Sequence, residues 1–274
     1  MSAPDETQAV FETAIRLAYD AGRLLRDRVG RQLEIAYKGA IDLVTEVDRA
    51  AEADIGKGIA EAHPTHAMLG EEGTSTGVPV AAAEWVWIVD PIDGTTNFAH
   101  GYPHFAVSIA VVRNGIGEIG IVFDPSRDEL FAARKGGSAT LNGRQIRVSN
   151  VESFSRSLIG TGFSYDLAKR DEQYAIWMRL HGQCQGIRRE GSAALGVAWV
   201  AAGRLDGFYE RPINAWDVGA GAVLVEAAGG SVTALDGSPR DVFGQEMAAS
   251  NGNIHREMLV GIADAASGAR VLAG

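Results

Sequence analysis

Apolar residues recur at helical spacing in the first part of the chain. Between Thr7 and Val29 they stand three or four positions apart, with charged residues between them, at Val10, Ala14, Leu17, Ala18, Ala21, Leu24 and Leu25. This pattern predicts an amphipathic helix. A second helix is predicted from Asp48 to Ala62, closed by Pro64. The intervening segment LEIAYKGAIDLVTEVD predicts two short strands joined by a turn at Lys38-Gly39.

A series of strands is predicted to follow the second helix. The apolar run from Trp85 to Val89 indicates a buried strand. The segments FAVSIAVVRNG and EIGIVFDPSRDELFAARKGG predict antiparallel strands with turns at Asn114-Gly115 and Pro125-Ser126. SATLNGRQIRVSN adds a hairpin that turns at Asn142-Gly143.

The pattern changes near residue 150. Strands then alternate with helices predicted at Arg170–His181, Ser192–Ala202 and Asp217–Ala228. We therefore expect an α+β lobe over residues 1–145 that carries the metal-binding motifs, followed by an α/β lobe over residues 146–274. No linker rich in Pro, Gly or Ser separates them, so the two lobes should pack tightly as one unit.

Charge and cysteine content narrow the class of protein. The 274 residues carry a net charge of -10, from 25 basic and 35 acidic side chains. This balance argues against partners such as nucleic acid or an anionic membrane. The single cysteine, Cys184, permits neither an intrachain disulfide nor a zinc site built from several thiolates. The polar, acidic start and the lack of a long apolar run predict a cytoplasmic location.

One glycine pattern in the sequence is misleading. Gly115 to Gly120 matches G-x-G-x-x-G, but a β-like segment follows it, whereas a dinucleotide site needs a helix there. We therefore predict a hairpin turn. No Walker-type phosphate loop occurs, and Cys184 lacks the C-x₅-R pattern of a cysteine phosphatase because Glu190 stands at the arginine position.

The stretch WIVDPIDGTTNFAHG carries the main candidate chemistry. Pro91 cannot donate to a strand ladder, so we expect the strand to end there. Gly94 permits a conformation that other residues resist, and Thr95 can then begin a helix. Asp90 and Asp93 would bring two negative charges together, which repel unless a cation lies between them.

Further carboxylates stand at the boundaries of predicted elements. Glu71 and Glu72 lie in LGEEG, Asp42 and Asp48 flank a strand-like segment, and Asp217 begins a glycine-rich helix. Each alone is typical of a solvated turn or a helix N-cap. Together they suggest an oxygen-ligand site for a hard cation such as Mg²⁺, since the six histidines form no zinc-like set.

Several of these motifs together resemble the inositol monophosphatase family. The matching segments are WIVDPIDGTTNFAHGYPHFAVSIAVV, GEEG, WDVGAGAVLVEAAGG, KGAIDLVTEVD and GSAALGVAWVAAGRLDGFYE, so the likeness extends from about residue 10 to about residue 260. It implies a layered αβαβα sandwich of the inositol monophosphatase and fructose-1,6-bisphosphatase type, with a mixed, largely antiparallel sheet followed by a smaller one. It also implies a lithium-sensitive homodimer.

The same resemblance implies an activity. The expected reaction is Mg²⁺-dependent hydrolysis of inositol monophosphate to inositol and phosphate, by direct in-line attack of a metal-bound water. One Mg²⁺ would be held by Glu71, Asp90 and the Ile92 carbonyl, and a second by Asp90, Asp93 and Asp217. A third, weaker ion would lie near Glu71.

Catalytic and substrate roles follow from the resemblance as well. Thr95 with Asp48 would orient and deprotonate the water, Glu71 would take part through its metal ion, and Glu72 would support them. Residues expected to contact the substrate are Lys38, Glu71, Ile92, Asp93, Gly94, Thr95, Gly191, Ser192, Ala193, Glu210 and Asp217. Among these, the Gly94 and Thr95 amides would hold the phosphate and Glu210 would bind ring hydroxyls. Gly73 departs from the family pattern, because a hydroxyl residue commonly follows the glutamate pair.

Other substrates within the superfamily remain open. Histidinol phosphate, a sugar bisphosphate or a 3′-phosphonucleotide are alternatives, and Arg188 or Arg189 could bind a second phosphate. Glu210 and the small residues 191–193 fit a small phosphorylated polyol better. A binding protein without turnover is disfavoured, because unused clustered carboxylates would only destabilise the fold.

Overall fold

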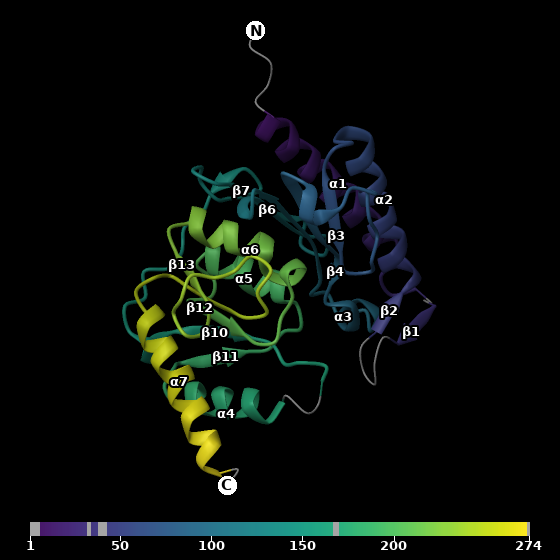
Figure 1. Cartoon of the computed structure of the whole chain (residues 1–274). Helices are drawn as coiled ribbons and strands as arrows, with labels where there is room; N and C mark the ends of the chain where they lie inside the picture. The colour runs from purple at the N-terminus through teal and green to yellow at the C-terminus, as the bar shows by residue number, and fades with distance from the viewer. Residues whose placement is uncertain (1–5, 32–33, 38–42, 167–169, 273–274) are drawn as a thin grey trace.

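The chain folds into alternating layers of helix and sheet, as the computed structural model shows (Figure 1). The structure describes residues 6–31, 34–37, 43–166 and 170–272. Within these ranges the helices are α1 (Glu6–Arg28), α2 (Glu46–Ala62), α3 (Thr95–Ala99), α4 (Arg170–His181), α5 (Ala193–Ala201), α6 (Ala215–Ala227) and α7 (His255–Leu272). No helix in the described ranges is long and apolar enough to cross a membrane.

The described strands form two large sheets and one small one. A seven-stranded sheet has the order β3-β4-β5-β6-β7-β8-β9, in which β3 is parallel to β4 and the other neighbours are antiparallel. A five-stranded mixed sheet has the order β11-β10-β12-β14-β13, and β1 pairs with β2. The bounds are β1 (Ile35–Tyr37), β2 (Leu43–Thr45), β3 (Ala67–Gly70), β4 (Trp85–Asp93), β5 (Ala106–Arg113), β6 (Ile116–Asp124), β7 (Glu129–Arg134), β8 (Thr140–Leu141), β9 (Arg144–Gln145), β10 (Leu158–Thr161), β11 (Gly186–Arg188), β12 (Gly207–Glu210), β13 (Ser231–Thr233) and β14 (Met247–Ser250).

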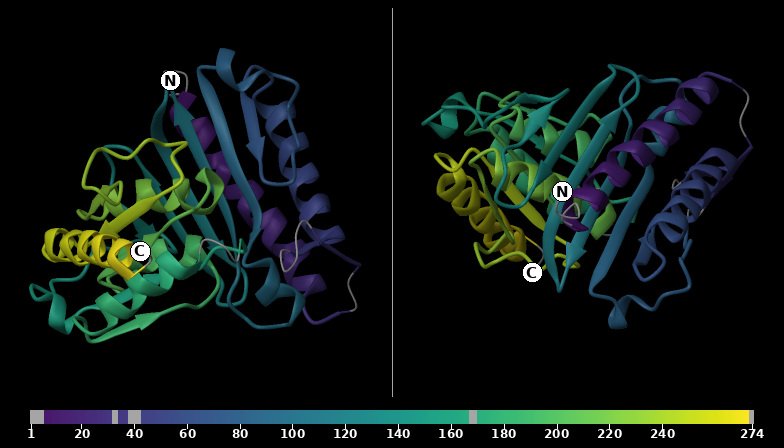
Figure 2. Two further views of the ribbon diagram at one scale, coloured as in Figure 1. Left: turned by 60° about the horizontal axis from the view of Figure 1, so that its bottom comes forward. Right: turned by 90° about the horizontal axis from the view of Figure 1, so that it is seen from above.

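Three apolar cores join these elements into five layers. Helices α1 and α2 cover one face of the seven-stranded sheet, α5 and α6 lie between the two large sheets, and α4 and α7 cover the outer face of the smaller sheet (Figures 1 and 2). Alternation along β4 produces the first two cores, since Trp87 and Val89 face α1 and α2 while Val86 and Ile88 face α5 and α6. The layered sandwich implied by the family resemblance is thereby confirmed.

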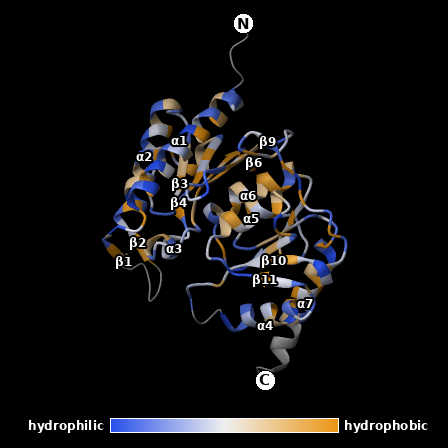
Figure 3. Cartoon of the chain, turned by 180° about the vertical axis from the view of Figure 1, so that it is seen from behind, coloured by the Kyte–Doolittle hydropathy of each residue, from blue (hydrophilic) through white to orange (hydrophobic). Residues whose placement is uncertain are grey.

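The middle helices are apolar on nearly all sides because sheets cover both of their faces. Figure 3 shows α5 and α6 mostly in hydrophobic colours, whereas α1, α2 and α4 also carry hydrophilic residues. Gly120 on β6 allows α6 to approach the sheet, because a Cβ atom there would overlap the Ala220 carbonyl. The glycine pattern therefore has structural causes, since Gly115 turns the hairpin at φ +78° and Gly120 admits α6. Ile116–Asp124 is a strand, as predicted.

Most predicted elements are found, with some differences in extent. The turns at Asn114-Gly115 and Asn142-Gly143 are confirmed by their positive φ angles. Helix α2 begins at Glu46, two residues before the predicted start. The final helix α7 was not predicted. The turn expected at Lys38-Gly39 lies outside the described residues.

The prediction that β4 ends at Pro91 is wrong. The strand continues to Asp93, because the pairing with β5 passes from Asp90–Ser108 to Asp93–Ala106 through a bulge. A bulge tolerates proline, since the ladder is interrupted there and the missing N–H leaves no acceptor unpaired. The division into lobes at residue 145 stays a prediction, and α5 and α6 contribute to the core that joins both sheets.

Candidate active site

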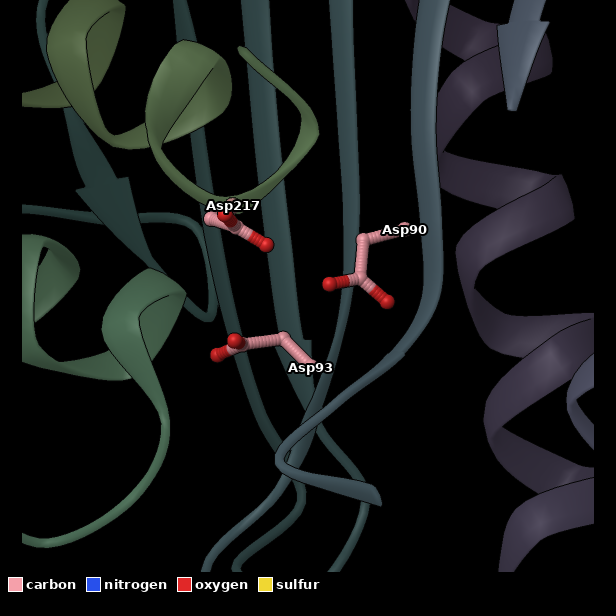
Figure 4. A group of neighbouring side chains, drawn as sticks. All are labelled: Asp90, Asp93 and Asp217. Atoms are coloured by element: carbon pink, nitrogen blue, oxygen red, sulfur yellow. The ribbon is translucent and has the colours of Figure 1, made fainter. Parts of the chain in front are cut away.

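Three aspartates converge where β4 ends and α6 begins. Asp90 and Asp93 project from the bulged end of β4, and Asp217 projects from the first turn of α6 (Figure 4). One carboxylate oxygen from each lies within 4.8 Å of the other two. The structure thus brings together residues that are more than 120 positions apart in sequence, as the sequence analysis expected.

Asp217 has a structural role as well as its place in this group. It is the third residue of α6, and its Oδ2 accepts a hydrogen bond of 2.8 Å from the backbone N–H of the N-cap residue Asn214. This capping-box bond fixes the carboxylate at the helix end. The lone N-cap interpretation is therefore incomplete, because the same side chain also faces Asp90 and Asp93.

The first turn of α5 holds Asp93. The Ser192 hydroxyl donates to Asp93 Oδ2, and the backbone N–H groups of Ala193 and Ala194 donate to its two carboxylate oxygens over 3.2 and 2.8 Å. The positive end of a helix favours a carboxylate at this position. Ser192 and Ala193, which were expected to face the substrate, thus also fix the orientation of Asp93.

The turn after β4 places Thr95 beside Asp48. Gly94 adopts φ +94°, a conformation that favours glycine, and the five-residue helix α3 begins at the next residue. Thr95 Oγ1 lies 3.0 Å from Asp48 Oδ1 and 3.0 Å from the Ile92 carbonyl oxygen. The other Asp48 oxygen accepts bonds from the N–H and hydroxyl of Thr45, the N-cap of α2. Asp48 is therefore held at both oxygens and links α2 to α3.

The β3–β4 register brings Glu71 beside Asp90. Gly70 is paired with Val89, so the next residue on each strand stands at the same end of the sheet. The Glu71 N–H continues this pairing by donating to the Val89 carbonyl over 3.1 Å. Glu72, the expected support, follows directly but does not line the cavity formed by this group.

Burial and mutual repulsion control the charge of this cluster. The pKa values of Asp90 and Asp217 lie well above the usual carboxyl value, because burial disfavours the ionised forms and the neighbouring carboxylates add repulsion. Burial also raises the pKa of Asp93 to about 6, although Ser192 and the α5 amides oppose this shift. A cation between the three would remove the repulsion, and a set made only of oxygen donors fits a hard cation.

These residues line a cavity of about 330 Å³. The expected site residues on its wall are Glu71, Asp90, Ile92, Asp93, Gly94, Thr95, Gly191, Ser192, Ala193, Glu210 and Asp217. Asp48 and Glu72 are not among the lining residues, and Lys38 falls outside the described residues. We call Glu71, Asp90, Asp93 and Asp217 the carboxylate cluster. We call residues 162–166, Arg189, Pro212 and Gln245, which belong to no helix or strand, the loop wall.

Glu210 lies at the end of β12, between these two parts. Burial raises its pKa to about 8, with repulsion from Asp93 adding to the shift and the Arg189 charge opposing it. At neutral pH, a protonated Glu210 would present a hydrogen-bond donor to a ligand in the cavity as well as acceptors.

Sequence reasoning missed several residues that shape the site. Asn97 donates from Nδ2 to the carbonyls of His104 and Glu190, at 2.7 and 2.8 Å, and so ties α3 to the segment before α5. Glu52 is buried on the inner face of α2 and was also missed. Its signal in the sequence was a second charged residue, one turn after Asp48, on a helical stripe whose other residues are small or apolar.

Comparison with known proteins agrees with this geometry. The model of the inositol monophosphatase family matches residues 6–267. The chain is 43% identical over 260 residues to the Nus factor SuhB of Pseudomonas aeruginosa, covering 93% of this chain and 96% of the relative. It is 45% identical over 257 residues to the inositol-1-monophosphatase of Synechocystis, covering 93% and 89%.

A solved structure supports the same assignment. The inositol monophosphatase of Anabaena superposes with a TM-score of 0.86 at 40% identity, covering 95% of this chain and 97% of the other. The chain therefore belongs to the inositol monophosphatase family, whose members are phosphatases.

Proposed function

We propose that this protein is a Mg²⁺-dependent phosphomonoesterase that hydrolyses inositol monophosphate, with release of inositol and inorganic phosphate. The observation that carries the proposal is the convergence of Asp90, Asp93 and Asp217, with raised pKa values, on the wall of one cavity. Buried carboxylates in this arrangement are stable as anions only when a cation joins them. The relative named inositol-1-monophosphatase supports the choice of substrate.

The metal ligands in this proposal are oxygen atoms of five residues. Glu71, Asp90 and the Ile92 carbonyl would hold one Mg²⁺, and Asp90, Asp93 and Asp217 a second. The family resemblance implies a third, weaker ion near Glu71. Bound Mg²⁺ supplies Lewis acidity and neutralises charge on the phosphoryl group. The donor set supports this assignment, because it contains no sulfur and no imidazole.

Asp48 and Thr95 form a path for the proton of the attacking water. Thr95 Oγ1 can donate its own proton to Asp48 Oδ1 at 3.0 Å while its lone pair accepts the proton of the water. Burial raises the Asp48 pKa, which makes this carboxylate a better proton acceptor than an exposed one. Glu72 is proposed as a neighbouring support of this group. Attack on phosphorus is then direct, without a phosphoenzyme.

The remaining lining residues suit a small polyol phosphate. The Gly94 and Thr95 amides are proposed to hold phosphate oxygens, and Glu210 and the Gly191–Ala193 segment to face the ring hydroxyls. A cavity of about 330 Å³ is at the small end of the range for ligand sites. Lys38 is retained as a proposed substrate contact from the family resemblance alone.

One observation favours a second candidate. Among the described residues that line the cavity, Arg189 is the single basic side chain. A guanidinium at this place would bind a second anionic group, so a sugar bisphosphate or a 3′-phosphonucleotide is the alternative substrate class. Histidinol phosphate, which carries a cationic group, is disfavoured by the same arginine.

A phosphate-release assay on a substrate panel tests the proposal. Inositol-1-phosphate, histidinol phosphate, fructose-1,6-bisphosphate and a 3′-phosphonucleotide are compared with and without Mg²⁺. We expect the highest kcat/KM on inositol-1-phosphate, strict dependence on Mg²⁺ and inhibition by Li⁺. Preference for a bisphosphate would select the second candidate, and absence of turnover on every substrate would refute a phosphatase. The homodimer is tested by light scattering. The cytoplasmic location stays a prediction from the sequence.

A further inference from the structure

We propose that Glu52, which lies outside the cavity, is a positioning residue that fixes the Glu71–Glu72 segment against the carboxylate cluster. The inference rests on the proposed function, because it concerns the same metal site. Glu52 is fully buried in α2, one turn after Asp48, on a stripe with Ala51 and Ile55. A carboxylate is costly to bury unless strong hydrogen bonds compensate for its lost hydration, so its partners show what it does.

The partners of Glu52 are two backbone amides of the segment that carries the expected metal ligand Glu71. Glu52 Oε2 accepts from the Glu72 N–H and Oε1 accepts from the Thr74 N–H, each over 2.7 Å. The other two amides of residues 71–74 bond to main-chain carbonyls. The Glu71 N–H donates to the Val89 carbonyl, and the Gly73 N–H donates to the Gly70 carbonyl. Four successive amides are thus satisfied, two of them by Glu52, which fixes the path of the backbone on both sides of Glu72.

This bracing acts at the place where β3 meets β4. Gly70 precedes Glu71 and packs directly on the Glu52 carboxylate, where a Cβ atom would overlap it. The Glu71 charge in turn raises the pKa of Asp90, so the two carboxylates are close enough to interact. A shift of the segment by a few tenths of an ångström would change how Glu71 and Asp90 face a shared ion.

Helix α2 therefore carries two carboxylates that each hold a neighbouring segment of the site. Asp48 binds the Thr95 hydroxyl of α3, and Glu52 binds the amides of residues 72 and 74. The two stand four residues apart on one helix face, so a rigid helix sets the separation between Thr95 and the Glu71 segment. The consequence is that Glu52 should control Mg²⁺ affinity without touching the ion.

The test is Mg²⁺ binding by isothermal titration calorimetry, without substrate, to full-length variants. Glu52→Gln keeps the shape but places an amide NH₂ group against a backbone N–H. We expect it to bind Mg²⁺ about 10- to 100-fold more weakly than the wild type, the range for residues that orient metal ligands. Gly70→Ala displaces the same carboxylate without removing its charge and should weaken binding in the same direction. Amide hydrogen exchange at residues 72 and 74 should be faster in both.

Asp124→Asn is the matched control. Asp124 is fully buried and accepts from the N–H groups of Ser126 and Arg127 at 2.8 and 3.1 Å, so it holds a turn as Glu52 does, but that turn does not line the cavity. We expect a lowered Tm and an Mg²⁺ affinity within about twofold of wild type, the size of a non-specific effect.

The outcomes distinguish a positioning role of Glu52, a purely structural role, and failure of the proposed function itself. Weakened Mg²⁺ binding in Glu52→Gln and Gly70→Ala, with normal binding in Asp124→Asn, supports the inference. Normal binding in a folded Glu52→Gln, with only the Tm lowered, would show a purely structural role and overturn it. If Glu52→Gln does not fold, normal binding in Gly70→Ala overturns it instead. A wild type that binds no Mg²⁺ would refute the proposed function, and the inference with it.

Discussion

The carboxylate cluster and the loop wall line the same cavity but are held in different ways. Asp93 is fixed by the first turn of α5, and Asp217 by its bond to the N-cap of α6. The loop wall consists of segments outside helices and strands, and its Tyr165 is 41% exposed. Gln173 is one residue that braces it, bonding the Ser164 N–H and the Arg211 carbonyl.

This difference suggests that the carboxylate cluster serves the chemical step and the loop wall serves substrate selection. Groups that act on the phosphoryl centre need fixed geometry, which helices and strands supply. Groups that select the substrate can differ among relatives, because loops tolerate change. We therefore expect substitutions in the carboxylate cluster to reduce turnover, and substitutions in the loop wall to change which substrate is preferred.

The largest effect is expected from Asp93→Asn. The substitution keeps the shape but removes a charge that would hold Mg²⁺, and it places an amide NH₂ group against a backbone N–H of α5. We expect phosphate release to fall by about 10³-fold, since metal-based charge stabilisation contributes several kcal/mol. Circular dichroism should show an intact fold, and Asp128→Asn, at an exposed carboxylate, should be fully active. Wild-type activity in Asp93→Asn would refute the metal assignment.

A second, smaller loss is expected from Thr95→Val. This change removes the hydroxyl that links Asp48 to the Ile92 carbonyl, so kcat should fall about 10²-fold with little change in KM. The neighbouring Thr96 is a close control, because its buried hydroxyl has no hydrogen-bond partner among the residues that the structure describes. Thr96→Val should therefore retain kcat and unfold at the same or a higher temperature. Equal kcat in both variants would exclude Thr95 from proton transfer.

The third prediction concerns how His104 changes the free energy of unfolding at acid pH. His104 packs its ring against Trp199, and burial together with the Arg127 charge lowers its pKa to about 4. The unfolded chain takes up this proton near pH 6.5, so the stabilising contribution of neutral His104 is present above pH 6.5 and is lost as pH falls towards 4. We expect a loss of about 2 kcal/mol in the free energy of unfolding, reduced from the full shift because Glu190 lies 3.8 Å from the ring.

Urea unfolding at several pH values measures this loss. His63, His66 and His255 also have lowered pKa values and titrate in the same direction. The contribution of His104 is therefore the difference between the wild type and His104→Phe. Identical pH profiles for the two proteins would contradict the prediction.

The smallest effect is expected in the loop wall. Arg189→Gln should leave kcat on inositol-1-phosphate unchanged and lower kcat/KM on a substrate with a second phosphate by about 5-fold, since an exposed charge pair contributes about 1 kcal/mol. Arg188 is the control, because it is exposed and does not line the cavity. A fall in kcat on both substrates would show that the loop wall takes part in the chemistry.

The sequence predicted local structure better than it predicted long-range contacts. Asp90 and Asp93 could be paired from their spacing, and the helix over residues 7–29 could be predicted from its periodicity. The bulge at Pro91 could not be predicted, because the pairing of β4 with β5 decides whether a proline breaks a strand. The hydrogen bond from Ser192 to Asp93 joins residues 99 positions apart, and no local sequence pattern predicts it.

The place of Asp217 beside Asp90 was reached through the family resemblance, since its own segment is typical of a helix N-cap. Glu52 shows the opposite case. A charge on an apolar stripe was visible, but its amide partners lie 20 and 22 residues away across the layer boundary. Hydrogen bonds between layers depend on how the layers pack, which periodicity does not encode.

In the proposed function, the carboxylate cluster binds a divalent cation on which hydrolysis depends. Anomalous diffraction from crystals soaked in Mn²⁺, which replaces Mg²⁺ at oxygen sites, tests it most directly. We expect a strong peak between Asp90, Asp93 and Asp217 that disappears in Asp93→Asn crystals. A wild-type map without a peak there, from protein that releases phosphate in the same Mn²⁺ solution, would contradict the claim.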